Sequence, residues 1–250
     1  MNSEVRTSES RGRRLEQVGE LLRPTARVIR WSPLLVACGL AFIQVFVQTR
    51  DVCPPSNPCI GQEARVLALR IASILIALGA AFALDDPTEE TTGHLPTPRW
   101  LRRAVRVGLV APVVILTWAQ LIPLALRSSV DPDPFPTGAL TLELATLVIA
   151  SLAISAASAR FVPEAMGGVA AGPILLGLVG GAYFLPSKAA LFLLDPHAER
   201  WHAAHDVWRV LLLFAVAALI FVSRDPWRRS LRSRTPRRLP EDLEPRLLSS

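Results

Sequence analysis

The sequence predicts an all-α fold: a polytopic membrane protein with six transmembrane helices and an N-terminal amphipathic helix at the membrane interface. Three observations lead to this prediction. The apolar residues gather in six long stretches, hydrophobic residues make up 51% of the chain against 19% charged residues, and the arginines concentrate in alternate connecting segments. A helix needs about 20 apolar residues to cross the roughly 30 Å hydrocarbon core of a bilayer. The stretches are Trp31–Thr49, Ala64–Leu84, Ala104–Leu126, Thr137–Ser158, Met166–Pro186 and Val207–Ser223.

The apolar stretches define one membrane domain, residues 31–223. The first five stretches are long enough to span on their own, whereas the sixth is shorter and would need residues 201–206 to extend it. Between the stretches almost nothing is long enough to build a water-soluble core. We expect a cytoplasmic N-terminal segment, residues 1–30, before this domain and a basic cytoplasmic tail, residues 224–250, after it.

The placement of positive charge predicts the orientation. Most of the 27 basic residues lie before the first stretch, between the second and third, between the fourth and fifth, or after the sixth. The positive-inside rule puts these segments, and with them the N- and C-termini, in the cytoplasm. The abundance of arginine, alanine and proline hints at a GC-rich bacterial genome, so we expect a multi-pass protein of a bacterial plasma membrane. Basic segments beside a membrane meet anionic lipid, so we expect membrane lipids and no nucleic acid as partners.

The segment before the first span changes character along its length. Residues 15–30 carry apolar side chains at roughly helical spacing, with Arg and Glu between them. This pattern predicts an amphipathic helix on the inner membrane surface; the alternative is a plain polar tail.

The first outer loop, Arg50–Glu63, contains three prolines and the cysteines Cys53 and Cys59. The prolines predict a tight, non-helical turn. Because this loop is expected to face an oxidising compartment, Cys53 and Cys59 are candidates for a disulfide, with two free thiols as the alternative. Cys38 lies in the first span and is expected to be a buried, small apolar residue.

The later connections differ in length and polarity. The inner loop Asp85–Arg103 is the longest polar segment between spans. The second outer loop, Arg127–Pro136, is rich in proline and must be extended. The inner loop 160–165 is very short, so the fourth and fifth spans should be antiparallel neighbours. The last outer segment, Ser187–Asp206, is amphipathic and should lie in the interface or dip into the membrane and return.

A basic and an acidic residue lie deep inside two of the predicted spans. Arg70 and Glu143 each follow six positions after the outer start of a span, which puts both roughly 9 Å deep at 1.5 Å per residue. Isolated charges at that depth cost a few kcal/mol, so we expect the two to meet. They would form either the polar lining of a substrate path or a structural ion pair between the second and fourth spans.

The fifth span is rich in small residues, with two G-x-x-x-G spacings, Gly168–Gly172 and Gly177–Gly181. Such spacings let another helix approach closely, which indicates packing or flexibility during a transport cycle. On the outer side, His197, His202 and His205 lie near acidic residues. Glu199 and His202 could share a helix face with either His205 or Asp206. We interpret these histidines as hydrated interfacial side chains and expect no metal, because no zinc-ligand motif is present.

Motifs for chemistry are also missing. The chain has no P-loop, no G-x-S-x-G, and no nucleophile–base pair within the spans. We therefore expect no enzyme activity, no catalytic residues and no cofactor.

Several features together resemble the membrane subunits of bacterial ABC exporters of the second permease type, especially actinobacterial ones. Those proteins have six spans, cytoplasmic termini, an amphipathic helix before the first span and an irregular outer segment between the fifth and sixth. The order matches over roughly residues 15–225. Locally, Leu84–Pro87 with the later Pro96–Pro98 and Arg102-Arg103 resembles the loop after the second span, and Arg160 with Pro163-Glu164 resembles the turn into the fifth.

The resemblance implies a permease that does no chemistry itself. A separate cytoplasmic P-loop ATPase subunit would bind its inner face, and a second permease copy or homologue would pair with it around one path. The implied ATPase-coupling residues are Asp85, Asp86, Pro87, Arg102 and Arg103. Two alternatives remain: a membrane-anchored accessory or scaffold protein whose tail recruits a partner, and a lipid-modifying membrane enzyme that uses Arg70, Glu143 or the outer histidines.

Overall fold

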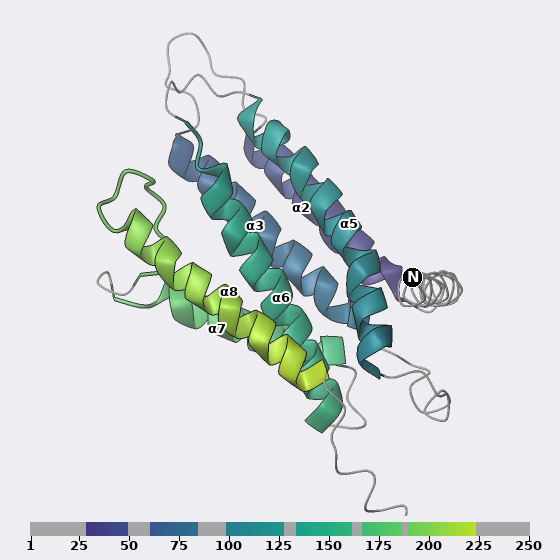
Figure 1. Ribbon diagram of the computed structural model, residues 1–250. Coiled ribbons are helices and arrows are strands. Elements are labelled where there is room, and N and C mark those ends of the chain that lie inside the picture. Colours follow the sequence, from purple (N-terminus) through teal and green to yellow (C-terminus); the bar gives the residue numbers. More distant parts are fainter. Residues whose placement is uncertain are drawn as a thin grey trace, which may run out of the picture.

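The computed structural model describes residues 29–49, 61–84, 99–127, 134–161, 167–186 and 190–223. Within these ranges all regular structure is helical, which confirms the all-α prediction (Figure 1). The helices are α2 (Trp31–Thr49), α3 (Gln62–Ala81), the short 3-10 helix η1 (Phe82–Leu84), α5 (Arg99–Leu126), α6 (Thr137–Phe161), α7 (Gly167–Tyr183) and α8 (Trp201–Ser223).

Successive long helices run in opposite directions. In Figure 1, α2 and α5 end at the top of the bundle, where α3, α6 and α8 begin. We call this the upper end and the opposite one the lower end. The upper end corresponds to the side that the arginine pattern predicts to be outside the cell.

Among the residues that the structure describes, five helices are long and apolar enough to cross a membrane: α2, α3 with η1, α5, α6 and α8. The protein is therefore a polytopic membrane protein. Residues 201–206 extend the sixth stretch, as the sequence prediction allowed, but the fifth stretch forms a shorter helix than predicted. Helix α8 has 23 residues because it begins at Trp201, whereas α7 has only 17.

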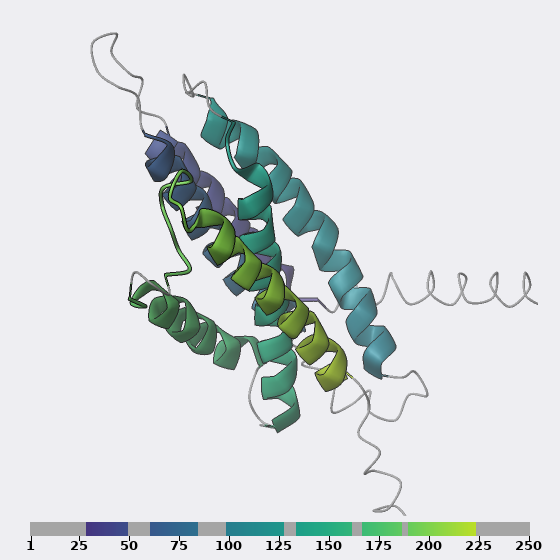
Figure 2. The same ribbon diagram turned by 60° about the vertical axis from the view of Figure 1, so that its left-hand side comes forward.

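The early end of α7 has a local cause. The predicted stretch extended to Pro186, but the helix stops at Tyr183. A proline disfavours helical backbone at the residue before it, and the adjacent Gly180 and Gly181 are poor helix formers. At 1.5 Å per residue, α7 is about 25 Å long, somewhat less than the hydrocarbon thickness. In Figure 2 it runs at a shallower slope than the other helices.

Helices α3 and α6 form the centre of the bundle. Helix α3 packs against α2, α5, α6 and α7, and α6 packs against α3, α7 and α8. The pair α2 and α5 lies on one side of this centre, and α7 and α8 lie on the other (Figure 1). Helices α3 and α6 are accordingly the most buried spans, and α8 is the least buried.

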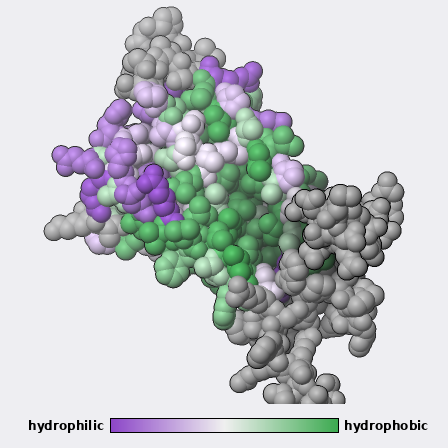
Figure 3. Space-filling model, in the orientation of Figure 1, coloured by the Kyte–Doolittle hydropathy of each residue, from purple (hydrophilic) through white to green (hydrophobic). Residues whose placement is uncertain are grey.

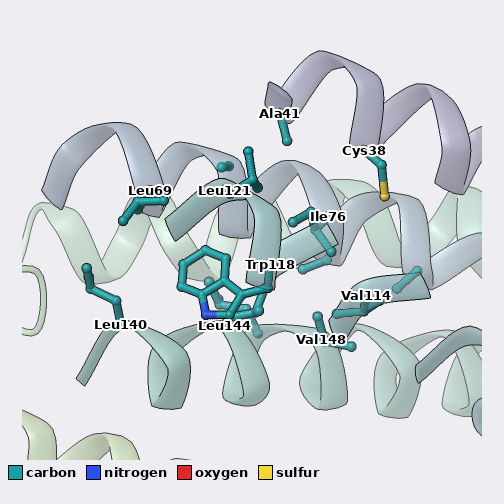
Figure 4. Packing of buried hydrophobic residues seen from close by; sticks show 14 of the residues in the cluster. Cys38, Ala41, Leu69, Ile76, Val114, Trp118, Leu121, Leu140, Leu144 and Val148 are labelled. Carbon is teal, nitrogen blue, oxygen red and sulfur yellow. The ribbon is translucent and has the colours of Figure 1, made fainter. Parts of the chain in front are cut away.

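The core is apolar and tightly packed. Figure 4 shows the Trp118 indole of α5 among Leu69 and Ile76 of α3 and Leu140 and Leu144 of α6. The Trp118 Nε1 donates a hydrogen bond to Thr141 Oγ1 at 2.9 Å, so the buried ring leaves no unpaired donor.

Helix α3 presents a glycine, Gly79, directly against α2. A Cβ placed on Gly79 of α3 would lie 2.6 Å from Ala37 Cβ and 3.2 Å from the carbonyl oxygen of Pro33, both on α2. By contrast, a Cβ added to Gly177, Gly180 or Gly181 of α7 would meet nothing within 4 Å. The glycine at this tight contact thus lies outside the two predicted G-x-x-x-G spacings, and in the first of them a Cβ on Gly172 would lie 3.9 Å from the Leu78 side chain of α3.

The outside of the bundle is largely apolar. In Figure 3 the hydrophobic residues cover the middle of the visible face, and hydrophilic residues gather toward its upper left. Large apolar side chains that point outward recur on the outer helices, as expected for surfaces that face lipid. They include Leu35, Ile43 and Phe46 of α2, Ile115 and Leu116 of α5, and Leu213, Phe214 and Phe221 of α8.

Several predictions fall outside the described residues. They are the amphipathic helix over most of residues 15–30, the Cys53–Cys59 disulfide, and the coupling residues Asp85, Asp86 and Pro87. One boundary prediction was wrong: α5 begins at Arg99, so Arg102 and Arg103 lie in a helix rather than in the loop. The helix starts directly after Pro98, and the arginine and leucine residues that follow are good helix formers.

Candidate functional site

A cluster of charged and aromatic side chains lies inside the upper half of the bundle. The central helices contribute Arg70 from α3 and Glu143 from α6. Helix α8 contributes Trp201, His205 and Trp208, which follow one another at intervals of four and three residues and therefore share one face. All three are buried, so this is the face that α8 turns toward α6.

Arg70 and Glu143 form a bidentate ion pair. The Arg70 Nε lies 2.7 Å from Glu143 Oε2, and its Nη2 lies 2.7 Å from Oε1. The two side chains are only 4% and 1% exposed. The structure thus brings together the two residues that sequence depth predicted to meet. Parallel N–H···O bonds of this kind are charge-assisted and fix the orientation of both groups.

His205 adds a third charged or chargeable group on the other side of the carboxylate. Its Nε2 lies 3.1 Å from Glu143 Oε1, and its Nδ1 lies 2.8 Å from the carbonyl oxygen of Trp201, one turn earlier in α8. The Trp201 ring stacks at a tilt on the imidazole, with 4.4 Å between the ring centroids. Glu143 therefore receives contacts from two basic side chains, one from each neighbouring helix.

Residues 190–200, which precede α8 and which we call the upper segment, fold back onto this cluster. Arg70 Nη1 donates to the carbonyl oxygen of Leu193, and Trp208 Nε1 donates to that of Leu191 at 3.2 Å. The Arg70 guanidinium carbon lies 5.5 Å from the centroid of the Phe192 ring and 5.7 Å from that of Trp201. Aromatic faces at these distances attract a cation.

These contacts explain why two formal charges and an imidazole are tolerated inside the protein. A buried ion is strongly destabilising unless it is paired and its remaining hydrogen-bonding groups are satisfied. Here the guanidinium bonds to two carboxylate oxygens and one backbone carbonyl, and two aromatic rings cover it. The arrangement can hold charge and position a proton. Within the described residues it places no serine, threonine or cysteine in hydrogen-bond contact with Glu143 or His205.

At the lower end, two arginines of α5 contact the ends of other helices. Arg103 Nη1 donates to the carbonyl oxygen of Val222, near the end of α8, at 3.0 Å. Arg106 Nη1 donates to the carbonyl oxygen of Leu84, the last residue of η1, at 3.2 Å. Cations near a helix C-terminus interact favourably with its carbonyls and its dipole. The start of α5 therefore links the lower ends of α3 and α8.

The interpretation of the histidines was right for two residues and wrong for the third. His197 and His202 are exposed, but His205 is buried against Glu143. His202 follows the buried Trp201 by one residue, about 100° further round the helix, whereas His205 follows it by about one turn and points the same way. Among the described residues, no group of three His, Cys, Asp or Glu side chains is placed to hold a metal ion.

Sequence reasoning thus missed His205 and the backbone carbonyls of the upper segment. The spacing of Trp201, His205 and Trp208 was the available signal, since two aromatic residues flank a histidine on one face. Asp206 and Arg209, which follow His205, concealed this spacing because they make the start of the helix polar. Those two neighbours pair with each other on the exposed side of α8.

Comparison of the chain with protein-family models, with curated proteins and with solved structures finds no match.

Proposed function

We propose that this polytopic membrane protein is the permease subunit of an ABC-type exporter, energised by a separate cytoplasmic ATPase. In this proposal α7 is a sixth span, so that all six helices cross the plasma membrane and both termini are cytoplasmic. A span somewhat shorter than the hydrocarbon core is accommodated by local thinning of the bilayer. The residues before α2 form the amphipathic helix on the inner surface, and a second permease copy completes the transport path.

The observation that carries this proposal is the order of the helices together with the position of the arginines. Six apolar helices follow one another, and basic residues such as Arg103 and Arg106 lie at the end that the positive-inside rule assigns to the cytoplasm. The segment that follows Leu84 carries Asp85 and Asp86 at this end. Because Arg106 bonds to Leu84, a force applied to that segment reaches both α3 and α5.

The chain has no nucleotide-binding motif, so a transporter of this kind needs a partner that hydrolyses ATP. The test is co-purification of a tagged full-length protein with a P-loop ATPase encoded beside it. We expect the ATPase to be retained, and to be lost when Asp85, Asp86 and Pro87 are replaced together by alanine. Replacement of Asp195, an exposed carboxylate at the upper end, is the matched control and should leave binding intact.

A chain with the triple replacement that still binds and activates the ATPase would contradict the coupling assignment. A reporter fused after Ser250 tests the orientation on which the proposal depends. A reporter that works only in the cytoplasm should be active at this position. Activity of an exported reporter at this position would place the coupling residues on the wrong side of the membrane.

A membrane-anchored accessory protein is the second candidate, and one observation favours it. The upper segment covers Arg70 and Glu143, whose side chains are 4% and 1% exposed. In this conformation they form a structural ion pair. Such a protein would have no ATPase partner but would bind a cytosolic protein through residues 224–250. Deletion of that tail would then abolish partner capture and leave the helix bundle intact.

A further inference from the structure

The two contacts of the His205 ring together need one proton more than a neutral ring supplies. The His205 Nδ1 faces the carbonyl oxygen of Trp201 at 2.8 Å, and a carbonyl can only accept. A hydrogen bond at this contact therefore requires the hydrogen on Nδ1. In a neutral imidazole the other nitrogen, Nε2, then has a lone pair, which would point at a lone pair of Glu143 Oε1 across 3.1 Å. One further proton is needed between these two atoms.

The other neutral tautomer does not remove this requirement. With the hydrogen on Nε2, the ring could donate to Glu143, but the lone pair on Nδ1 would then face the carbonyl of Trp201. A neutral ring beside an ionised Glu143 therefore satisfies one of its two contacts and loses the other. Both contacts are kept only when the Glu143–His205 pair holds an additional proton.

The hydrogen bonds of Arg70 indicate where that proton resides. Arg70 donates to both carboxylate oxygens of Glu143, which are thus acceptors in a bidentate ion pair. This geometry fits an ionised carboxylate, with the additional proton on the His205 ring. Transfer of the proton to Oε1 would keep the same contact, with the acid donating to Nε2.

We propose that Glu143 and His205 form a proton-binding site, and that the bound proton fastens the upper segment and the first turn of α8 to the central helices. His205 ties the Trp201 carbonyl to Glu143. Arg70 ties the Leu193 carbonyl to the same carboxylate. Release of the proton leaves a neutral ring that can keep only one of its two contacts. The start of α8, and the upper segment with it, is then held less firmly at Glu143.

The surrounding helices bring few other groups that titrate or carry charge. Helix α3 contributes Arg70 and, five residues nearer the upper end, the buried Arg65, and α6 contributes Glu143. On α8, Asp206 and Arg209 pair with each other on the exposed face, with about two thirds of each side chain exposed. In the upper segment the acidic and basic side chains are exposed, namely Asp195, His197, Glu199 and Arg200. Helix α7 carries no Asp, Glu, Lys, Arg or His.

The site faces the end of the bundle at which the upper segment folds back. His205 is 7% exposed at its side chain, so a proton reaches it when that segment moves. The device would therefore make the upper end of the protein open and close with the pH of the compartment it faces. This inference does not require an ATPase partner, so its failure and the failure of the proposed function are separate outcomes.

The first measurement is of the ring itself. The full-length protein in detergent micelles, with 15N-labelled histidine, has four histidines, and the signals missing in His205→Gln identify His205. We expect nitrogen shifts of a doubly protonated ring at low pH and of a singly protonated ring at high pH. If His205→Gln fails to fold, Trp201→Phe assigns the signals instead, because it removes the indole ring current that acts on His205. A ring that is never doubly protonated while the protein is folded would overturn the proposal.

The second measurement is of the upper segment. Trypsin cleavage after Arg200 is compared with cleavage after Arg127, which is exposed at the same end, in a single digest. The ratio cancels the pH dependence of the protease. We expect this ratio to rise over the same pH range in which the His205 ring loses its second proton. His205→Gln should lose that pH dependence, whereas the matched variant His202→Gln, on the exposed face of the same turn, should retain it.

Two results of the digest would contradict the fastening role. One is a cleavage ratio in the unmodified protein that does not change while the ring passes between its two protonation states. The other is a His205→Gln protein that keeps the pH dependence of the unmodified protein. In either case the proton would be bound without holding the segment.

Discussion

Arg70 and Glu143, 73 residues apart in the chain, join the two central helices by two hydrogen bonds of 2.7 Å each. Replacing Glu143 by alanine leaves the Arg70 guanidinium buried without its counter-charge. Breaking a buried pair in this way costs about 3–5 kcal/mol. We expect a correspondingly large fall in the denaturation midpoint of the purified protein in detergent. Asp206→Ala, which breaks an exposed pair on α8, is the control and should change the midpoint little.

Exchanging the two charges should restore only part of this loss. The variant with Arg70→Glu and Glu143→Arg keeps an ion pair between α3 and α6. However, a glutamate at position 70 cannot donate to the Leu193 carbonyl or lie as a cation beside Phe192. Expression and thermal stability should therefore fall between those of Arg70→Glu and the unmodified protein. Full recovery would show that the upper segment is held by other contacts.

Gly79 should tolerate no larger residue. An added Cβ would lie 2.6 Å from Ala37 Cβ and 3.0 Å from Leu34 Cα, so α2 and α3 would have to move apart. Overpacking of this kind destabilises by about 1–3 kcal/mol. Thermal unfolding followed by circular dichroism should show a lower midpoint for Gly79→Ala. Gly39→Ala in α2, where nothing lies within 4 Å of the new Cβ, should unfold at or above the original temperature.

The arginines at the start of α5 should protect the lower ends of two other helices. Arg106→Ala removes a donor from the Leu84 carbonyl, and Arg103→Ala removes one from that of Val222. We expect faster hydrogen exchange at the end of α3 with η1 in the first variant and at the end of α8 in the second. Arg127→Ala, an exposed residue at the upper end, should alter neither region. If neither variant changes the rate of hydrogen exchange in these regions, the contacts of Arg103 and Arg106 do not couple α5 to α3 and α8.

The reactivity of the thiols provides a test of the expected disulfide. Cys38 is buried in α2 and should react slowly. If Cys53 and Cys59 are bonded, a membrane-impermeant thiol reagent should label almost nothing in intact cells until a reductant is added. Cys38→Ser is the matched control and should give the same pattern. Labelling of both loop cysteines without a reductant would contradict the bridge.

The positions of the helices follow from local hydrophobicity, and sequence reasoning located most of them. A stretch such as Thr137–Ser158 is apolar enough to be recognised alone, and the structure extends it only to Phe161. Helix boundaries were harder to place where polar residues belong to a helix. Helix α8 begins at Trp201 although His202, His205, Asp206 and Arg209 lie in its first turns. The polar residues in such turns are stabilised by contacts with residues distant in the chain, which a local sequence pattern does not show.

The meeting of Arg70 and Glu143 was predictable because depth in a membrane restricts where two charges can lie. Helical rise alone places both at one level, and hydrocarbon drives them together. The third partner was not predictable in this way. His197, His202 and His205 are close in sequence and similar in their neighbours, yet only His205 lies against the carboxylate among them.

Hydropathy and the distribution of arginine were sufficient to establish a membrane-spanning helical chain, since each depends on residues within one stretch. The rotation of α8 about its axis, the return of Leu191 and Leu193 over the guanidinium, and the tight contact of Gly79 with α2 were decided only in the folded bundle. They depend on which surfaces of distant helices fit together, because a helix turns the face inward that best pairs its polar groups and fills the space beside its neighbours.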